Sequence, residues 1–212
     1  SHLPCAVHTN YYKDGWRTRK QGIPHMMPPT DQLEALIGRL GIKNNTHVVI
    51  YGSGTGPFDA AETTSIYLTF KYLGHDSVSI LDGGFNKWIS EKRIVTNELP
   101  KIKKSKNYKT NENKSWIKNK KQIQDNIKDK KFILVDTRVQ ERFEGKVNEP
   151  RTGLKRGHIE NAINIPFKDC INKKTNTLKT KEELKYPKTA FLNEKSTLGQ
   201  DVGLEQFSIH IL

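Results

Sequence analysis

Cysteine is scarce in this chain, and its scarcity excludes several kinds of site. Only Cys5 and Cys170 occur among 212 residues, and two such distant thiols form neither a disulfide framework nor a metal-binding spacing. The seven histidines also lack the paired spacing typical of zinc ligands. We therefore expect no metal and no other cofactor. So few thiols fit a reducing compartment, and we predict a cytoplasmic location.

Hydrophobic residues are also few, at 34% of the chain. They predict a modest core, although the length allows one large domain or two small ones. No apolar run reaches the roughly 18 residues of a membrane span. No basic segment followed by an apolar stretch marks a secretory signal either. We expect no membrane partner.

Acidic residues are outnumbered by basic ones, and the formal net charge is +13. Such a charge is compatible with nucleic-acid binding through phosphate contacts. However, the lysines spread over the second half with few aromatic residues among them, which is typical of solvated positions. We favour the second interpretation and expect no nucleic-acid partner. The charge would still favour encounters with small anions.

The first half alternates helical and strand patterns. Leu33, Leu36, Ile37 and Leu40 recur with helical spacing after Thr30, a candidate cap, and Gly41 ends the pattern. Residues 48–51 then form a predicted buried strand, 59–73 a helix, 78–81 a second strand, and a short helix contains Trp88. This alternation predicts a parallel α/β sheet.

The second half repeats the alternation after a lysine-rich stretch. Residues 96–115 lack apolar periodicity and are predicted to be a linker. Residues 116–127 predict a helix, 132–136 a buried strand, and 162–166 a short strand that a proline ends. Arg138, Arg142 and Arg151 are among the arginines that lie between these two strands.

An internal repeat relates the two halves. Residues 1–8 parallel residues 157–164, with His2 matching His158 at an offset of 156 positions. A repeat of this kind indicates two copies of one unit. The strand at 132–136 has no counterpart in the first copy, so we expect the chain to lack its first strand.

The motifs resemble those of tandem-domain rhodaneses, the thiosulfate and 3-mercaptopyruvate sulfurtransferases. In the second half they are Asp136-Thr137-Arg138, Glu141-Arg142-Phe143, Glu149-Pro150-Arg151, Gly157-His158-Ile159 and Asn164-Ile165-Pro166-Phe167. In the first half they are residues 2–7, 24–28, 40–42 and 81–85. The resemblance implies an α/β fold of two rhodanese-like domains, each a parallel sheet flanked by helices and each incomplete. The expected domains are 1–95 and 116–212, joined by 96–115, with the resemblance lost after about residue 186.

The resemblance implies transfer of sulfane sulfur through a cysteine persulfide, from 3-mercaptopyruvate or thiosulfate to a thiol or cyanide acceptor. This chemistry requires a thiolate in a strand-to-helix loop, where backbone N–H groups lower its pKa. Gly52 stands at that position in the first loop, and the second loop would fall near Val202 to Ser208, where there is no cysteine. We therefore predict no catalytic residue in this chain. We interpret the chain as a fragment, or as a chain whose final residues are altered.

Two arginines remain as predicted substrate-binding residues. The resemblance implies that Arg142 and Arg151 hold the anionic sulfur donor, because a planar guanidinium suits a bidentate grip on a carboxylate or thiosulfate. The alternative for each is an ion pair with Glu141, Glu144 or Glu149.

Four further residues are assigned outside the chemistry. We predict that Arg138 pairs with an acid near the strand end, that His158 anchors its turn, and that Cys5 and Cys170 are incidental thiols. The competing function is a non-catalytic rhodanese module that binds anions or a protein partner.

Overall fold

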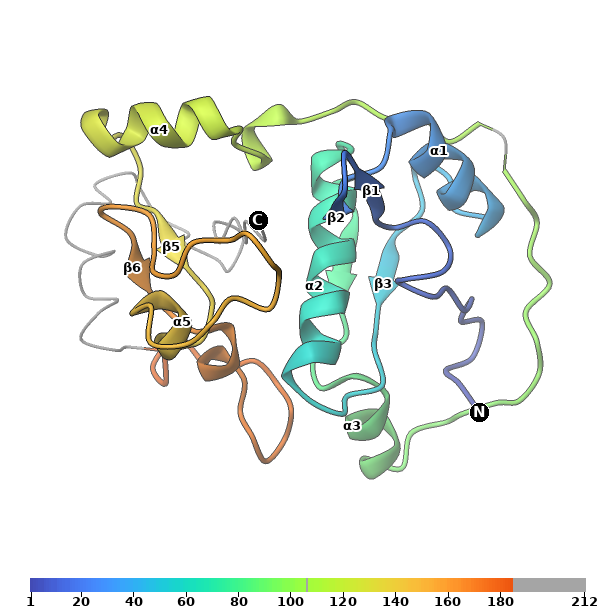
Figure 1. Cartoon of the computed structure of the whole chain (residues 1–212). Helices are drawn as coiled ribbons and strands as arrows, with labels where there is room; N and C mark the ends of the chain where they lie inside the picture. Colours follow the sequence, from blue (N-terminus) through green and yellow to red (C-terminus); the bar gives the residue numbers. More distant parts are fainter. Residues whose placement is uncertain (106, 185–212) are drawn as a thin grey trace. The chain divides into compact units, whose positions relative to one another are not determined.

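The computed structural model describes residues 1–105 and 107–184, which form two compact units (Figure 1). The first unit comprises Ser1–Trp116 and Thr175–Thr177, and the second comprises Ile117–Lys174 and, of the described residues, 178–184. Each unit combines helices with a pair of parallel strands, so the predicted α/β class is confirmed. In the described part of the chain, no helix has both the length and the apolar character needed to cross a membrane.

The first unit is built on two parallel strands and three helices. Its elements are β1 Thr18–Lys20, β2 Ile23–Met26, α1 Thr30–Arg39, β3 Val48–Ile50, α2 Pro57–Tyr72, β4 Val78–Ile80, α3 Gly84–Ser90 and η1 Lys114–Trp116. Strands β3 and β4 are in register from Val48 opposite Val78 to Ile50 opposite Ile80, and α2 packs on both (Figure 1). The antiparallel hairpin of β1 and β2 was not predicted. Its turn contains Gln21 and Gly22, both at positive φ.

The second unit also pairs its strands in parallel. Its elements are α4 Lys120–Asp129, β5 Val135–Asp136, α5 Gln140–Phe143, β6 Ile163–Asn164 and η2 Phe167–Cys170. Strand β5 is shorter than predicted because the Asn126 side chain bonds the backbone of Phe132, donating to its carbonyl at 2.8 Å and accepting from its N–H at 3.0 Å. Helix α4 begins later than predicted because Asn119 caps it, in a capping box with Gln122.

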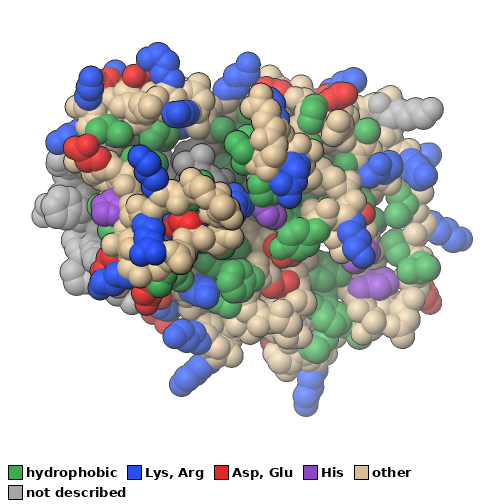
Figure 2. Space-filling model, in the orientation of Figure 1, with side chains coloured by type: hydrophobic (Ala, Val, Ile, Leu, Met, Phe, Trp, Pro, Cys, Tyr) green, Lys and Arg blue, Asp and Glu red, His purple; other side chains and the backbone are tan. Residues whose placement is uncertain are grey.

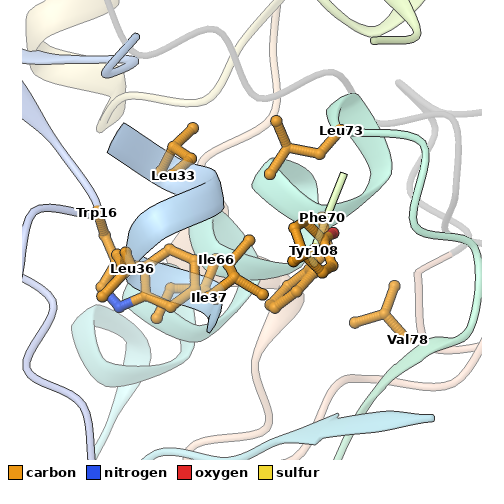
Figure 3. Packing of buried hydrophobic residues seen from close by; sticks show 9 residues of the cluster. All are labelled: Trp16, Leu33, Leu36, Ile37, Ile66, Phe70, Leu73, Val78 and Tyr108. Atoms are coloured by element: carbon orange, nitrogen blue, oxygen red, sulfur yellow. The ribbon is translucent and has the colours of Figure 1, made fainter. Parts of the chain in front are cut away.

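The core of the first unit lies between α1, α2 and β4 (Figure 3). The predicted inward residues Leu33, Leu36 and Ile37 are 0–2% exposed, which confirms the helical pattern. Thr30 is not a cap, because Pro29 occupies the N-cap position and the Thr30 hydroxyl donates to Glu112 instead. The nine buried members of the cluster are Trp16, Leu33, Leu36, Ile37, Ile66, Phe70, Leu73, Val78 and Tyr108.

Part of the lysine-rich stretch packs on the first unit. This segment, residues 105–113 with residue 106 not described, is called the strap. The Ser105 N–H donates to the Gly38 carbonyl at 2.8 Å, and the Asn111 N–H donates to the Leu73 carbonyl at 3.0 Å. Tyr108 is buried in the core at 2% exposure. The strap therefore provides hydrogen-bond donors to the carbonyls near the ends of α1 and α2. The predicted domain boundaries remain a prediction.

The internal repeat has a structural counterpart in each unit. Cys5 and Asn161, which the offset matches, both adopt a φ of 63°. In each copy, the N–H of the following alanine donates to a carbonyl three residues back, Leu3 at 3.1 Å and Ile159 at 3.0 Å. The same turn is therefore formed twice, as the repeat predicted.

Candidate functional site

Four charged side chains meet where β5 ends. They are Asp136, Arg138, Arg142 and Glu149, called here the arginine cluster. Arg138 donates from Nε to both oxygens of Asp136, at 2.9 and 3.0 Å, and from one terminal nitrogen to the Gly157 carbonyl at 2.7 Å. Arg138 therefore fastens the strand end to the loop before β6, which confirms its predicted structural role.

Glu149 is the central acid of the arginine cluster. Its side chain is only 3% exposed and forms ion pairs with both Arg138 and Arg142. The distance from Arg138 is 2.7 Å, and Arg142 donates from Nε at 3.2 Å as well as from NH2. The alternative partner predicted for Arg142 is thus realised with Glu149.

The charges of the arginine cluster change the pKa values of its two carboxyl groups. Hydrogen bonding from Arg142 lowers the pKa of Glu149, burial opposes this effect, and the charges of Arg142 and Arg138 reinforce it. Burial of Asp136 would raise its pKa, but hydrogen bonds and charge from Arg138 outweigh burial, and the pKa lies below its usual value. Both acids are therefore ionised at neutral pH, and the four charges balance.

The two predicted substrate-binding arginines differ in their surroundings. Arg142 uses Nε and NH2 for Glu149, and its side chain is 30% exposed. Its NH1 forms no hydrogen bond or ion pair with the residues that the structure describes. Arg151 is half-buried and forms no hydrogen bond or ion pair with any residue in ranges 1–105 and 107–184. The described contacts join Arg142 to Glu149 and do not include Arg151. Anion binding by either arginine remains a prediction.

Two neighbouring residues hold the loops around the arginine cluster. Asn164 in β6 is 5% exposed and donates to the carbonyls of Asp136 and Arg138, both at 2.9 Å. Sequence reasoning missed this role, although a polar residue inside an apolar strand was a signal for it. His158 donates from Nδ1 to the Phe143 carbonyl at 2.7 Å, and its ring stacks on that of Phe143 at 3.7 Å. His158 thus anchors its turn to α5, as predicted.

Neither thiol lies in a strand-to-helix loop. Cys5 is exposed in the repeated turn. Cys170 ends η2, and burial, followed by the charge of Asp169, raises its pKa. A raised pKa disfavours the thiolate. The predicted second loop, near residues 202–208, lies outside the described residues. The part of the chain that is described contains no group of three metal-ligating side chains.

The repeated unit and the arginine cluster at a strand end define a duplicated α/β protein. The family of rhodanese-like domains matches residues 1–91 and 119–197. This chain belongs to that family, and the predicted pair of rhodanese-like domains is confirmed.

Similar proteins include two kinds of sulfurtransferase. The thiosulfate sulfurtransferase of Mus musculus is 37% identical over 177 residues, covering 82% of this chain and 57% of the relative. The 3-mercaptopyruvate sulfurtransferase of Homo sapiens is 31% identical over 186 residues, covering 87% of this chain and 60% of the relative. The chain therefore spans less than two thirds of the length of these relatives.

Solved structures show the same fold. SseA from Escherichia coli, described as having the rhodanese fold, aligns with a TM-score of 0.67 and 22% identity, over 86% of this chain and 64% of its own. YnjE aligns with a TM-score of 0.73 and 19% identity, over 91% of this chain and 45% of its own. At these identities the likeness concerns the fold alone.

Proposed function

We propose that this chain serves the sulfurtransferase reaction of its relatives. The reaction moves sulfane sulfur from 3-mercaptopyruvate or thiosulfate to a thiol or cyanide acceptor. In this proposal, the chain contributes the scaffold and binds the anionic donor through Arg142 and Arg151. It contributes no nucleophilic cysteine. The names of the relatives support the reaction class, and we place the reaction in the cytoplasm.

One observation carries the proposal: the two edges of the Arg142 guanidinium have different surroundings. Glu149 holds the edge formed by Nε and NH2. NH1 forms no hydrogen bond or ion pair in the described part of the chain, and it can donate to a carboxylate or a thiosulfate oxygen. Since the arginine cluster is neutral by itself, Arg151 supplies the added positive charge that favours an anion.

Donor binding tests this proposal. Thiosulfate and 3-mercaptopyruvate are titrated calorimetrically into the wild-type chain, Arg142→Gln, and the matched control Arg156→Gln. Arg156 is an exposed arginine of the same unit that bonds Asn148. We expect Arg142→Gln to weaken binding about tenfold, since a hydrogen bond to a charged group contributes about 1.5–3 kcal/mol. Equal weakening by both variants would show a general charge effect and would refute the assignment.

Arg151 governs the choice of donor in this proposal. In a full-length enzyme, Arg151→Ala should raise the KM for 3-mercaptopyruvate, because it removes a guanidinium that grips the carboxylate. Unchanged kinetics would remove the preference for this donor.

A non-catalytic rhodanese module is the second candidate function. The described thiols fit such a module, since Cys5 lies in a turn and the pKa of Cys170 is raised. Such a module would bind anions or a protein partner without transferring sulfur. Adding a family-type C-terminus with its cysteine loop to the chain distinguishes the two candidate functions. Sulfur transfer should then appear if the first proposal is correct, and its absence in a folded protein would favour the module.

A further inference from the structure

The loop between β3 and α2 has its N–H donors occupied by a side chain of the same unit. Asp59, in the first turn of α2, accepts hydrogen bonds from the Ser53 N–H and the Ser53 hydroxyl, each at 2.9 Å. Its second oxygen accepts from the Gly54 N–H at 2.7 Å. The carboxylate is thus surrounded by three donors, as a bound anion would be.

The carbonyl side of the same loop is occupied as well. The Phe85 N–H donates to the Gly52 carbonyl at 2.9 Å, and the Asn86 N–H donates to the Ser53 carbonyl at 3.0 Å. A Cβ on Gly84 would lie 2.6 Å from the Gly52 carbonyl oxygen, so the loop and the start of α3 are in close contact. The first unit therefore provides hydrogen-bond partners of its own for these N–H groups and carbonyls of the loop.

At Gly52, a larger residue would have to displace the Asp59 carboxylate. A Cβ at Gly52 would lie 2.5 and 2.6 Å from the two carboxylate oxygens of Asp59, well inside van der Waals contact. Gly52 is the position at which the first loop would carry a nucleophile. A thiolate there would need the same N–H donors and would be repelled by the nearby negative charge.

We propose that this loop is an anion cradle that the chain keeps filled with the Asp59 carboxylate. The first unit then lacks a nucleophile at Gly52 but keeps the cradle, which its own carboxylate occupies. A tethered carboxylate competes well with free anions because it does not lose translational freedom on binding. The ligand class of the emptied cradle is a small oxyanion or a thiolate. This inference concerns the first unit and stands apart from donor binding at Arg142.

An amide titration tests the occupied cradle directly. Thiosulfate is added to isotope-labelled wild-type chain, to Asp59→Ala, and to the control Asp31→Ala, which removes an exposed acid from the first turn of α1. We expect saturable shifts of the Ser53 and Gly54 amide signals in Asp59→Ala only. Unchanged amide signals in a folded Asp59→Ala variant, or shifts of equal size in the wild type, would overturn the proposal. Signals from the second unit report on Arg142 separately, so the failure of one site is distinguishable from the failure of the other.

A thiol placed in the loop gives a second test. In a Cys5→Ser, Cys170→Ser background, Gly52→Cys is compared with Gly52→Cys combined with Asp59→Ala, and alkylation by iodoacetamide is followed against pH. Removal of the carboxylate should lower the pKa of the introduced thiol and speed its reaction at neutral pH about tenfold, which corresponds to about one pKa unit. Equal pKa values in the two folded variants would refute the proposal. If Gly52→Cys alone does not fold, the amide titration decides, because it leaves Gly52 unchanged.

Discussion

Gly38→Ala should destabilise the first unit, although alanine is the better helix former. Gly38 is a buried residue of α1, and a Cβ there would lie 2.1 Å from the Ser105 carbonyl oxygen and 3.3 Å from its carbon. Both atoms belong to the backbone of the strap, so no side-chain rotation can relieve the overlap. The strap must move away, and the hydrogen bond from Ser105 to Gly38 is lost with it.

The substitution makes opposing contributions to the free energy of unfolding. Alanine in place of glycine gains about 1 kcal/mol of helix propensity. Loss of the hydrogen bond costs about 1 kcal/mol. Tyr108 lies three residues further along the strap and is 2% exposed, and removing a buried aromatic side chain completely costs about 3–5 kcal/mol. Partial displacement of Tyr108 therefore gives a net loss of about 1–3 kcal/mol.

Urea unfolding followed by tryptophan fluorescence measures this effect, because Trp16, Trp88 and Trp116 all lie in the first unit. Ala35→Gly, at an exposed position of the same helix, calibrates the propensity contribution alone. In a Tyr108→Ala background, Gly38→Ala should cost much less, because the strap is already loosened. A higher urea midpoint for Gly38→Ala, or simple additivity with Tyr108→Ala, would refute the reasoning.

Three other substitutions have defined outcomes. Glu149→Gln should cost about 2 kcal/mol at neutral pH, since it leaves two arginines without their buried partner. Because the pKa of Glu149 is lowered in the folded state, the difference in urea unfolding by circular dichroism should shrink as pH falls below about 4. Cys5→Gly should raise stability by about 1 kcal/mol in thermal unfolding, because φ is 63° at Cys5 and glycine adopts this conformation without strain. Arg17→Lys should cost about 2 kcal/mol in urea, because a lysine cannot replace the guanidinium hydrogen bonds to Ser65 and Thr69.

Regular elements could be predicted because their patterns are local. The helical spacing of Leu33, Leu36 and Ile37 predicted α1, and the apolar run before Asp136 predicted β5. Their ends were less predictable, because they depend on single side chains. Asn126 shortens β5 by bonding Phe132, and nothing in the apolar pattern signals this contact.

The contacts between distant segments were the least predictable. The strap has no apolar periodicity, and it is held by one aromatic anchor, Tyr108, and by backbone hydrogen bonds to α1 and α2. The longer stretch around it, residues 96–115, is rich in lysine, and this composition favoured a linker. The roles of Arg138, in the arginine cluster, and of His158, beside it, were predicted from their motifs. The central position of Glu149 could not be predicted, because Glu141 and Glu144 lie nearer to Arg142 in the sequence and were equally available as partners.

Lysine and arginine side chains are scattered over the visible face of the molecule (Figure 2). This distribution supports the interpretation that most of the positive charge is solvated. Our proposal therefore assigns donor binding to Arg142 and Arg151, and not to the net charge of +13.

The most direct test of the central claim is the intact mass of the chain after incubation with 3-mercaptopyruvate or thiosulfate. The claim is that a rhodanese-like scaffold keeps its site for the anionic donor while its own thiols, Cys5 and Cys170, cannot carry the sulfur. The account predicts an unchanged mass with both donors, at concentrations where calorimetry detects donor binding. A gain of one sulfur atom, reversed by cyanide and mapped to either cysteine, would contradict it.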